Sequence, residues 1–165
     1  MLGCQCEMPN GEERQVAIKP VENEGELLQA LAIREVVFIE EQHVPESFER
    51  DADDSSAYHV LALDGGHAIG TGRLVMLPKA PKNETGQWAQ ISRMAVLQAY
   101  RSAGLGTKLL EALEEQGRSS NAVGITLHAQ LSSLDFYKQH GYEAVGAVFQ
   151  EAGMPHLEMR KMLPA

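Results

Sequence analysis

The sequence predicts a single α/β (α+β) domain built around a sheet of about seven strands. Its 165 residues are 44% hydrophobic and 22% charged, which is enough apolar material for one core. Segments with the periods of strands and helices follow one another as strand, helix, three strands, helix, strand, helix and two strands. The middle of the chain, residues 90–118, has the pattern of a strand, a tight glycine turn and a helix, and the rest is interpreted around it.

The beginning of the chain differs in composition from the remainder. Residues 1–13 are polar and contain glycine, so we expect a flexible N-terminal segment before a domain of residues 14–165. Residues 14–19 alternate as a short first strand.

The later elements are predicted from caps, turns and periodicity. Asn23 followed by Glu26 is typical of a helix cap, and apolar residues at helical spacing continue the helix toward Glu41. Asp64-Gly65-Gly66 is a strong hairpin signal. The remaining predictions are strands at residues 58–63, 67–77, 90–96, 123–129, 142–150 and 156–162, a helix from Leu105 that stops at Gly117, and a helix at residues 132–140.

The glycine turn predicts an anion site. Gly104 and Gly106 allow backbone angles that a side chain would forbid, and a helix start presents amides and the positive end of a dipole. A mononucleotide loop is excluded because Lys108 stands two residues after the last glycine, and a dinucleotide loop is excluded because Leu109 stands where a third glycine is required. The remaining pattern is Arg101-x-x-Gly104-x-Gly106 after a strand.

Charge is unevenly distributed along the chain. The net charge is −9, yet residues 85–110 contain no Asp or Glu and do contain Arg93, Arg101 and Lys108. Residues 40–54 hold seven acids and a single base. One interpretation is a solvated loop; the other is an acidic lip that attracts a cationic co-substrate, while the basic turn binds an anion.

Composition excludes several classes of function. With 23 acidic and 14 basic residues, binding to nucleic acid or to an anionic membrane is disfavoured. No apolar run approaches the roughly 18 residues of a membrane span. Cys4 and Cys6 cannot build a disulfide framework, and no histidine pair has zinc-site spacing, so we expect no metal and a cytoplasmic location.

Several separate motifs, in order along the chain, resemble the GNAT superfamily of N-acetyltransferases. The turn Arg101-x-x-Gly104-x-Gly106 is similar to the pyrophosphate loop of that superfamily, and residues 127–130, 136–137 and 141–142 are similar to its second conserved block. Residues 37–45 and 151–156 resemble the ElaA/YjcF-like branch. Together the matches span about residues 33–162.

The resemblance implies a fold and an activity. The fold is a single GNAT-type domain with a mixed, largely antiparallel sheet, a splayed central strand pair and about four helices. The activity is that of an acyltransferase that moves the acetyl group of acetyl-CoA to a primary amine of a small molecule or peptide by direct attack. The alternatives are a non-catalytic acyl-CoA-binding sensor or interaction module, and an unrelated α/β domain for another phosphorylated ligand. The oligomeric state is left open, with a homodimer as one option.

The resemblance also implies cofactor-binding residues. The backbone of Met94, Ala95 and Val96 would bind the pantetheine arm. The turn that would hold the pyrophosphate consists of Arg101, Ser102, Ala103, Gly104, Leu105, Gly106 and Thr107. Gln130 stands where many family members have Asn, and Ser133 stands where many have Ala.

Tyr137 matches the family tyrosine that protonates the leaving thiolate, and an ordinary phenol of pKa about 10 suits a thiol of similar acidity. Core packing is the alternative role for this residue. The general base stays open among His43, His59, Glu41 and a water chain. His128 and His156 fit the branch pattern, but a structural role is favoured for each of the six histidines.

Overall fold

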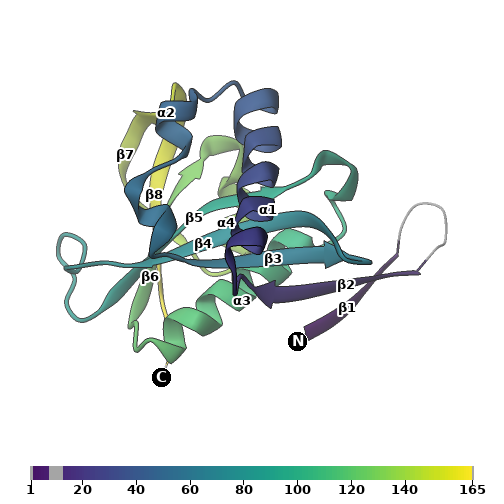
Figure 1. The fold of residues 1–165 in the computed structure, drawn as a ribbon. Coiled ribbons are helices and arrows are strands. Elements are labelled where there is room, and N and C mark those ends of the chain that lie inside the picture. The colour runs from purple at the N-terminus through teal and green to yellow at the C-terminus, as the bar shows by residue number, and fades with distance from the viewer. Residues whose placement is uncertain (1, 8–12, 165) are drawn as a thin grey trace. The chain divides into compact units, whose positions relative to one another are not determined.

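The computed structural model describes residues 2–7 and 13–164 (Figure 1). The chain forms two compact units, which are described separately. The first comprises Met1–Arg73 and Arg93–Leu113, and the second comprises Leu74–Ser92 and Glu114–Ala165. Strands β4 and β5 and helix α3 begin in one unit and end in the other.

The element order confirms the predicted mixed α/β domain. The elements are β1 (Leu2–Glu7), β2 (Glu13–Pro20), α1 (Glu24–Arg34), a π-helix (Glu35–Glu41), α2 (Glu46–Glu49), a 3-10 turn (Ala52–Ser55), β3 (Tyr58–Asp64), β4 (His67–Met76), β5 (Trp88–Val96), a 3-10 turn (Gln98–Tyr100), α3 (Leu105–Ser119), β6 (Gly124–Gln130), a 3-10 turn (Leu131–Ser133), α4 (Leu134–Gln139), β7 (Glu143–Glu151) and β8 (Met154–Met162).

The sheet is mixed and largely antiparallel, as predicted. Within the described residues it has eight strands in the order β1-β2-β3-β4-β5-β6-β8-β7. The pairs β1–β2, β2–β3, β6–β8 and β7–β8 are antiparallel, and β5–β6 is parallel. Strand β1 was not predicted from the sequence. Leu2, Cys4 and Cys6 do alternate with other residues, but so short an alternation does not identify the partner that β2 provides. Residues 8–12 of the expected flexible segment lie outside the described residues.

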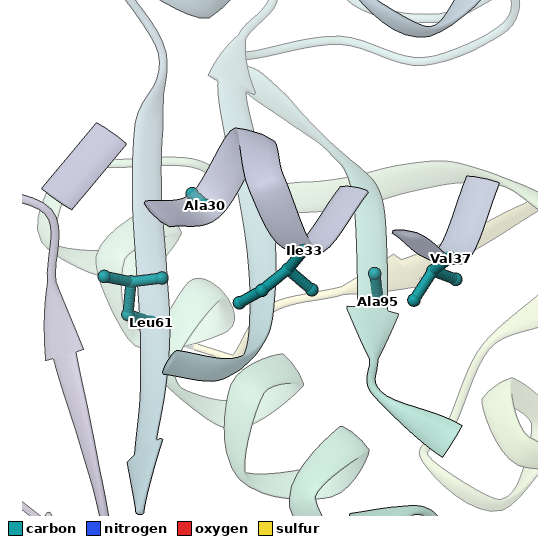
Figure 2. Packing of buried hydrophobic residues seen from close by; sticks show 5 residues of the cluster. All are labelled: Ala30, Ile33, Val37, Leu61 and Ala95. Atoms are coloured by element: carbon teal, nitrogen blue, oxygen red, sulfur yellow. The ribbon is translucent and has the colours of Figure 1, made fainter. Parts of the chain in front are cut away.

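Helix α1 begins where the cap was predicted and covers β3. The Asn23 side chain accepts a hydrogen bond from the Glu26 amide at 2.9 Å. Buried Ala30 and Ile33 lie on the helix face that packs against Leu61 of β3, in a core that Val37 and Ala95 complete (Figure 2). Packing of this face, more than helix propensity, stabilises the helix.

Two predicted helix boundaries require correction. The predicted helix to Glu41 changes to a π-helix after Arg34, with the Gln42 amide bonded to the Val37 carbonyl at 3.2 Å. Helix α3 does not stop at Gly117 but continues to Ser119. A Cβ on Gly117 would lie 3.1 Å from Cδ1 of Ile125, so this glycine allows the helix to approach β6.

Strand β5 continues to Val96 but contains a residue with unusual backbone angles before the glycine turn. Its parallel register with β6 includes Trp88–Gln90 against Gly124–Thr126. Arg93 then has φ +57°, in the left-handed region that a long side chain rarely adopts. Such a residue inside a strand re-aims the backbone that follows, as a bulge does.

Candidate functional site

The predicted anion site is an exposed turn in the first unit. Ser102 has φ +69° and Gly104 has φ +79°, and α3 begins directly afterwards. Gly104 is exposed, and a Cβ added there would meet no atom within 4 Å. Gly106 lies inside the first turn of α3, so only Gly104 needs the conformational freedom predicted for both glycines. The turn therefore leaves room for a ligand at the helix start.

The amides at this helix start are suited to bind an anion. The Lys108 amide bonds to the Gly104 carbonyl at 3.3 Å, which is the first bond of the helix ladder. Amides closer to the start, such as those of Leu105 and Gly106, have no acceptor within the helix, because no helical carbonyl precedes them by four residues. They point along the positive end of the helix dipole, where a phosphate group is stabilised.

Arg101, which was expected to add charge to this site, is bound to Glu41. Its two terminal nitrogens each lie 2.8 Å from a Glu41 carboxylate oxygen, and its Nε donates to the Val96 carbonyl at 2.9 Å. The hydrogen bond from Arg101 lowers the pKa of the Glu41 carboxyl, although partial desolvation opposes it. A lower pKa makes Glu41 a poorer proton acceptor, which argues against it as the general base.

The segment that was expected to supply the pantetheine contact follows Arg93. Ala95 is buried and forms part of the α1 core, while Met94 and Val96 are half-buried. The Val96 carbonyl accepts the hydrogen bond from Arg101, so a side chain of the turn binds the end of β5 within the first unit. This arrangement fixes the direction in which β5 enters the glycine turn.

Much of the acidic segment is paired with arginines, which weakens the interpretation of the segment as an acidic lip. Three arginines and three acids form what we call the arginine cluster: Arg34, Arg73, Arg93, Glu49, Asp51 and Asp54. Its formal charges balance. A cationic co-substrate would have to compete with these arginines.

Arg34 is the centre of the arginine cluster. Its side chain is 1% exposed, bonds to the Glu49 carboxylate through Nε and lies 2.7 Å from Asp54 Oδ1 through Nη1. Burial acts to raise the pKa of Asp54, but hydrogen bonds and charge from Arg34 outweigh it and lower that pKa to about 2. Asp54 therefore remains ionised at neutral pH, because the guanidinium replaces the water that its carboxylate loses.

Arg73 and Arg93 join the same cluster from β4 and β5. Arg73 Nη1 lies 2.7 Å from Asp51 Oδ1, and Arg93 Nη2 lies 3.3 Å from Asp51 Oδ2. Arg93 also donates to the carbonyls of Glu49 and Phe48 at 2.9 and 3.1 Å. These bonds hold the side chain whose backbone is left-handed, so the cluster supports the unusual backbone angles in β5.

Two histidines considered as bases differ in their surroundings. His43 is exposed, with φ +58°, just after the π-helix. His59 is 4% exposed, its Nε2 lies 2.9 Å from the Asp54 carbonyl, and its Nδ1 has no partner among the described residues. Burial lowers the pKa of His59. A buried imidazole beside a cluster of arginines is poorly placed to exchange protons with a substrate.

The second unit holds Gln130, Ser133 and Tyr137. Gln130 ends β6 opposite His156 of β8, and Ser133 precedes α4. Tyr137 is buried, with its ring 5.0 Å from that of Phe136 and 5.8 Å from that of Tyr142. Burial raises the pKa of Tyr137 to about 12, which corrects the value of about 10 assumed from the sequence. The structure groups these three residues in one unit and the glycine turn in the other.

The second unit contains a histidine–glutamate contact that was not predicted from the sequence. His128 of β6 lies 3.0 Å through Nδ1 from Glu151 Oε1 of β7, and Nε2 of His156 lies 3.8 Å from the other oxygen of Glu151. Phe149 packs against both rings. The sequence contained a signal, because both histidines lie in motifs that resemble the family, but only the strand order β6-β8-β7 brings Glu151 beside them.

Two other kinds of site are absent from the described residues. In that part of the chain, no helix has the length and apolar character needed to cross a membrane. The described histidine, cysteine and acidic side chains form no group of three suited to a metal ion.

Comparison with known proteins gives one consistent result. A family model for the acetyltransferase (GNAT) domain matches residues 18–163. YjcF of Bacillus subtilis strain 168, an uncharacterised N-acetyltransferase, is 36% identical over 140 residues, covering 84% of this chain and 94% of YjcF. YyaT of the same organism, also uncharacterised, is 35% identical over 147 residues, covering 87% of this chain and 94% of YyaT.

Solved structures are similar over almost the same length. A Lactobacillus plantarum protein assigned as an N-acetyltransferase superimposes with a TM-score of 0.78 at 26% identity, covering 90% of this chain and 99% of that one. Escherichia coli ElaA has a TM-score of 0.74 at 24% identity, covering 88% of this chain and 99% of ElaA, which supports the shared fold.

Proposed function

Because the chain belongs to the GNAT acetyltransferase family and uses acetyl-CoA as its co-substrate, we propose that it transfers the acetyl group to a primary amine of a small molecule or peptide. The observation that carries this proposal is the exposed turn at Gly104, which opens α3 and leaves space in front of the helix start. A pyrophosphate bridge carries negative charge that helix amides and their dipole stabilise. We place the enzyme in the cytoplasm.

The residues proposed to bind acetyl-CoA form two groups, one for the pyrophosphate and one for the pantetheine arm. The turn of residues 101–107 would bind the pyrophosphate through amides other than that of Arg101, which donates to the Gln98 carbonyl at 3.3 Å. The backbone of Met94, Ala95 and Val96 would bind the pantetheine arm. Gln130 and Ser133 would add side-chain contacts to that arm. The openness of the turn at Gly104 supports the first assignment, and the left-handed Arg93 supports the second because it re-aims the strand just before Met94.

Tyr137 is proposed to donate the proton that the departing thiolate takes up. A phenol whose pKa is raised to about 12 by burial stays protonated at neutral pH, so its O–H remains a donor. The phenol hydrogen-bonds to the sulfur as negative charge develops there, and it gives up its proton as the C–S bond breaks.

The acceptor is proposed to be a small molecule or a peptide. Fewer acidic side chains are available to attract a cationic acceptor than the sequence indicates. The arginine cluster occupies three acids of the acidic segment, and Arg101 occupies Glu41. Exposed Glu40 and Asp53 remain to attract positive charge, whereas Glu46 lies 4.0 Å from Arg50. Any preference for cationic acceptors should therefore be modest and sensitive to salt.

The experiment is an assay of free thiol released from acetyl-CoA with a panel of primary amines. We expect amine-dependent release, and Tyr137→Phe should lower kcat by about 100-fold while the KM for acetyl-CoA stays the same. Tyr58→Phe, at a half-buried tyrosine, is the control and should keep full activity. Absence of thiol release with every amine, although coenzyme A binds in calorimetry, would contradict the proposal.

That contradicting result would favour a non-catalytic acyl-CoA binder. One observation supports this second candidate, namely the packing of Tyr137 between Phe136 and Tyr142, where a structural role needs no chemistry. In that case Tyr137→Phe would leave coenzyme A affinity unchanged and alter only stability. The thiol assay separates the two functions directly.

A further inference from the structure

The second unit contains a polar strand face on β6, β8 and β7. In a strand, alternate residues share a face, so His128 and Gln130 project from the same side of β6. Two residues along a strand correspond to about 7 Å. The backbone of His128 therefore lies about 7 Å from that of Gln130, the residue proposed to contact the pantetheine arm.

The pairing of β6 with β8 and β7 completes this face. His128 lies opposite Glu158 and Gln130 opposite His156, and Phe149 of β7 lies opposite His156 in turn. Glu151 is two residues beyond Phe149 and so lies on the same face. The face thus gathers two imidazoles and two carboxylates from three strands.

The two carboxylates have different partners. Glu158 accepts a hydrogen bond from Thr126 at 3.0 Å and is held by Arg160 at 3.1 Å, so its charge is already compensated. Glu151 is exposed and lies 3.0 Å from Nδ1 of His128. The contact with Glu151 therefore decides the state of the His128 ring.

This contact selects the useful tautomer of His128. A carboxylate accepts a hydrogen bond only from a protonated nitrogen, so Nδ1 carries the hydrogen and the lone pair is on Nε2. Nε2 is the ring nitrogen directed away from the carboxylate. The side chain is 35% exposed, so a substrate can reach the ring. An imidazole oriented by a carboxylate in this way is a recurrent proton acceptor in enzymes.

The other histidines do not combine these features. His59 and His156 are buried, and His140 is bonded through Nδ1 to the Phe136 carbonyl at 2.7 Å. His43 and His67 are exposed, and neither contacts a carboxylate of the described residues. His128 alone in the described chain joins a carboxylate contact to partial exposure.

We propose that His128, oriented by Glu151, is the general base that removes the proton from the acceptor ammonium. The inference rests on the proposed function, because it names the base for the same transfer. His128 Nε2 takes one proton from the ammonium, and the neutral amine forms its C–N bond as the C–S bond breaks. The thiolate takes a proton from Tyr137, and the second nitrogen proton passes through water to restore the Tyr137 phenol. The products are the amide, the thiol and a protonated His128 that returns its proton to water.

The pH dependence follows from the groups that face His128. These are Glu151 of β7 and Glu158 and His156 of β8. The hydrogen bond to Glu151, more than the burial that opposes it, raises the pKa of His128 above its ordinary value. A base acts in its neutral form, so kcat/KM should rise with pH through an apparent pKa above about 6.5.

The test compares kcat/KM across pH for the wild type, His128→Gln and Glu151→Gln. For His128→Gln we expect a loss of about 100-fold at pH 7 that shrinks as pH approaches the pKa of the acceptor amine, where solvent removes the proton. Added imidazole should restore part of the activity of His128→Ala. Glu151 is a positioning residue, so Glu151→Gln should shift the kinetic pKa downward, and the NMR titration of the His128 ring should shift with it.

The controls are His67→Gln, an exposed histidine in the other unit, and Glu143→Gln, an exposed acid at the start of β7. Both should keep the wild-type pH profile. An active wild type with His128→Gln within about threefold of it and an unchanged profile would overturn the base assignment alone. Absence of amine-dependent thiol release by the wild type would instead overturn the proposed function.

Discussion

Two arginine–carboxylate pairs in the first unit have the same chemistry and opposite surroundings. In the pair Arg34–Glu49, each side chain is 1% exposed, whereas in Arg101–Glu41 the side chains are 38% and 36% exposed. Both link the acidic segment to an arginine that is distant in sequence. The comparison shows that burial, not charge, decides which arginine is part of the core and which is available to a ligand.

The physical reason is the cost of separating the partners. A buried guanidinium that loses its carboxylate keeps a charge that the protein interior cannot solvate, so the pair is effectively permanent. A half-exposed pair is worth only about 0.2–1 kcal/mol, and water or an anion can replace either partner. Arg101 can therefore exchange Glu41 for a phosphate group, whereas Arg34 cannot exchange Glu49 without disturbing the fold.

The largest expected effect comes from breaking the buried pair. Arg34→Met should lower the free energy of unfolding by about 3–5 kcal/mol, because buried Glu49 would lose its hydrogen-bonded guanidinium and Asp54 would keep only that of Arg73. Urea denaturation measures this loss. Arg101→Met, which breaks the exposed pair with Glu41, is the control and should cost no more than about 1 kcal/mol. Equal losses in the two variants would show that burial does not set the strength of these pairs.

The next effect is the acid sensitivity of the arginine cluster. The pKa of Asp54 is about 2 in the folded chain against an ordinary 3.8, so its contribution is complete above about pH 4 and is lost as pH falls toward 2. Asp54→Asn should cost about 1–3 kcal/mol at pH 7 and should flatten the fall of the urea midpoint between pH 4 and 2. Asp53→Asn, at its exposed neighbour, should leave that fall unchanged. An Asp54→Asn profile parallel to the wild type would show that other carboxyls control acid unfolding.

The fold could be predicted from the sequence because its signals are local. The cap at Asn23, the turn at Gly65-Gly66 and the periodicity around Gly104 each involve a few neighbouring residues. The stop at Gly117 was wrong because a glycine can serve close packing as well as termination, and only the contact with Ile125 distinguishes them. Strand β1 was missed because the alternation of Leu2, Cys4 and Cys6 is short and does not identify β2 as the partner.

The candidate site was less predictable because its decisive contacts join distant residues. Arg101 and Glu41 are 60 residues apart, and His128 and Glu151 are 23 apart. From the sequence, the acidic segment and the basic turn suggested two separate ligands, but the fold pairs much of one with the other. The raised pKa of Tyr137 has the same origin, since it depends on burial that no local motif reports.

The smallest expected effect concerns the exposed pair, Arg101 and Glu41, and its influence on coenzyme A binding. If Glu41 competes with phosphate for Arg101, Glu41→Gln should tighten coenzyme A binding by about threefold, as expected from the energy of an exposed pair. Arg101→Gln should weaken binding by a similar factor. Calorimetry at low and moderate salt measures both changes, and the gain in Glu41→Gln should shrink as salt screens the pair.

Glu40→Gln is the matched control for Glu41→Gln, because it removes the same charge from the adjacent exposed residue. If Glu41 competes directly for the Arg101 guanidinium, Glu41→Gln should exceed the control. Equal tightening in both variants would mean that net charge alone acts, since removing either acid weakens repulsion of the phosphates to the same degree. Weaker binding in Glu41→Gln would contradict competition. Glu41 would then hold Arg101 in the position in which it binds phosphate. The exposed pair, like the buried pair, would serve to fix the position of its arginine.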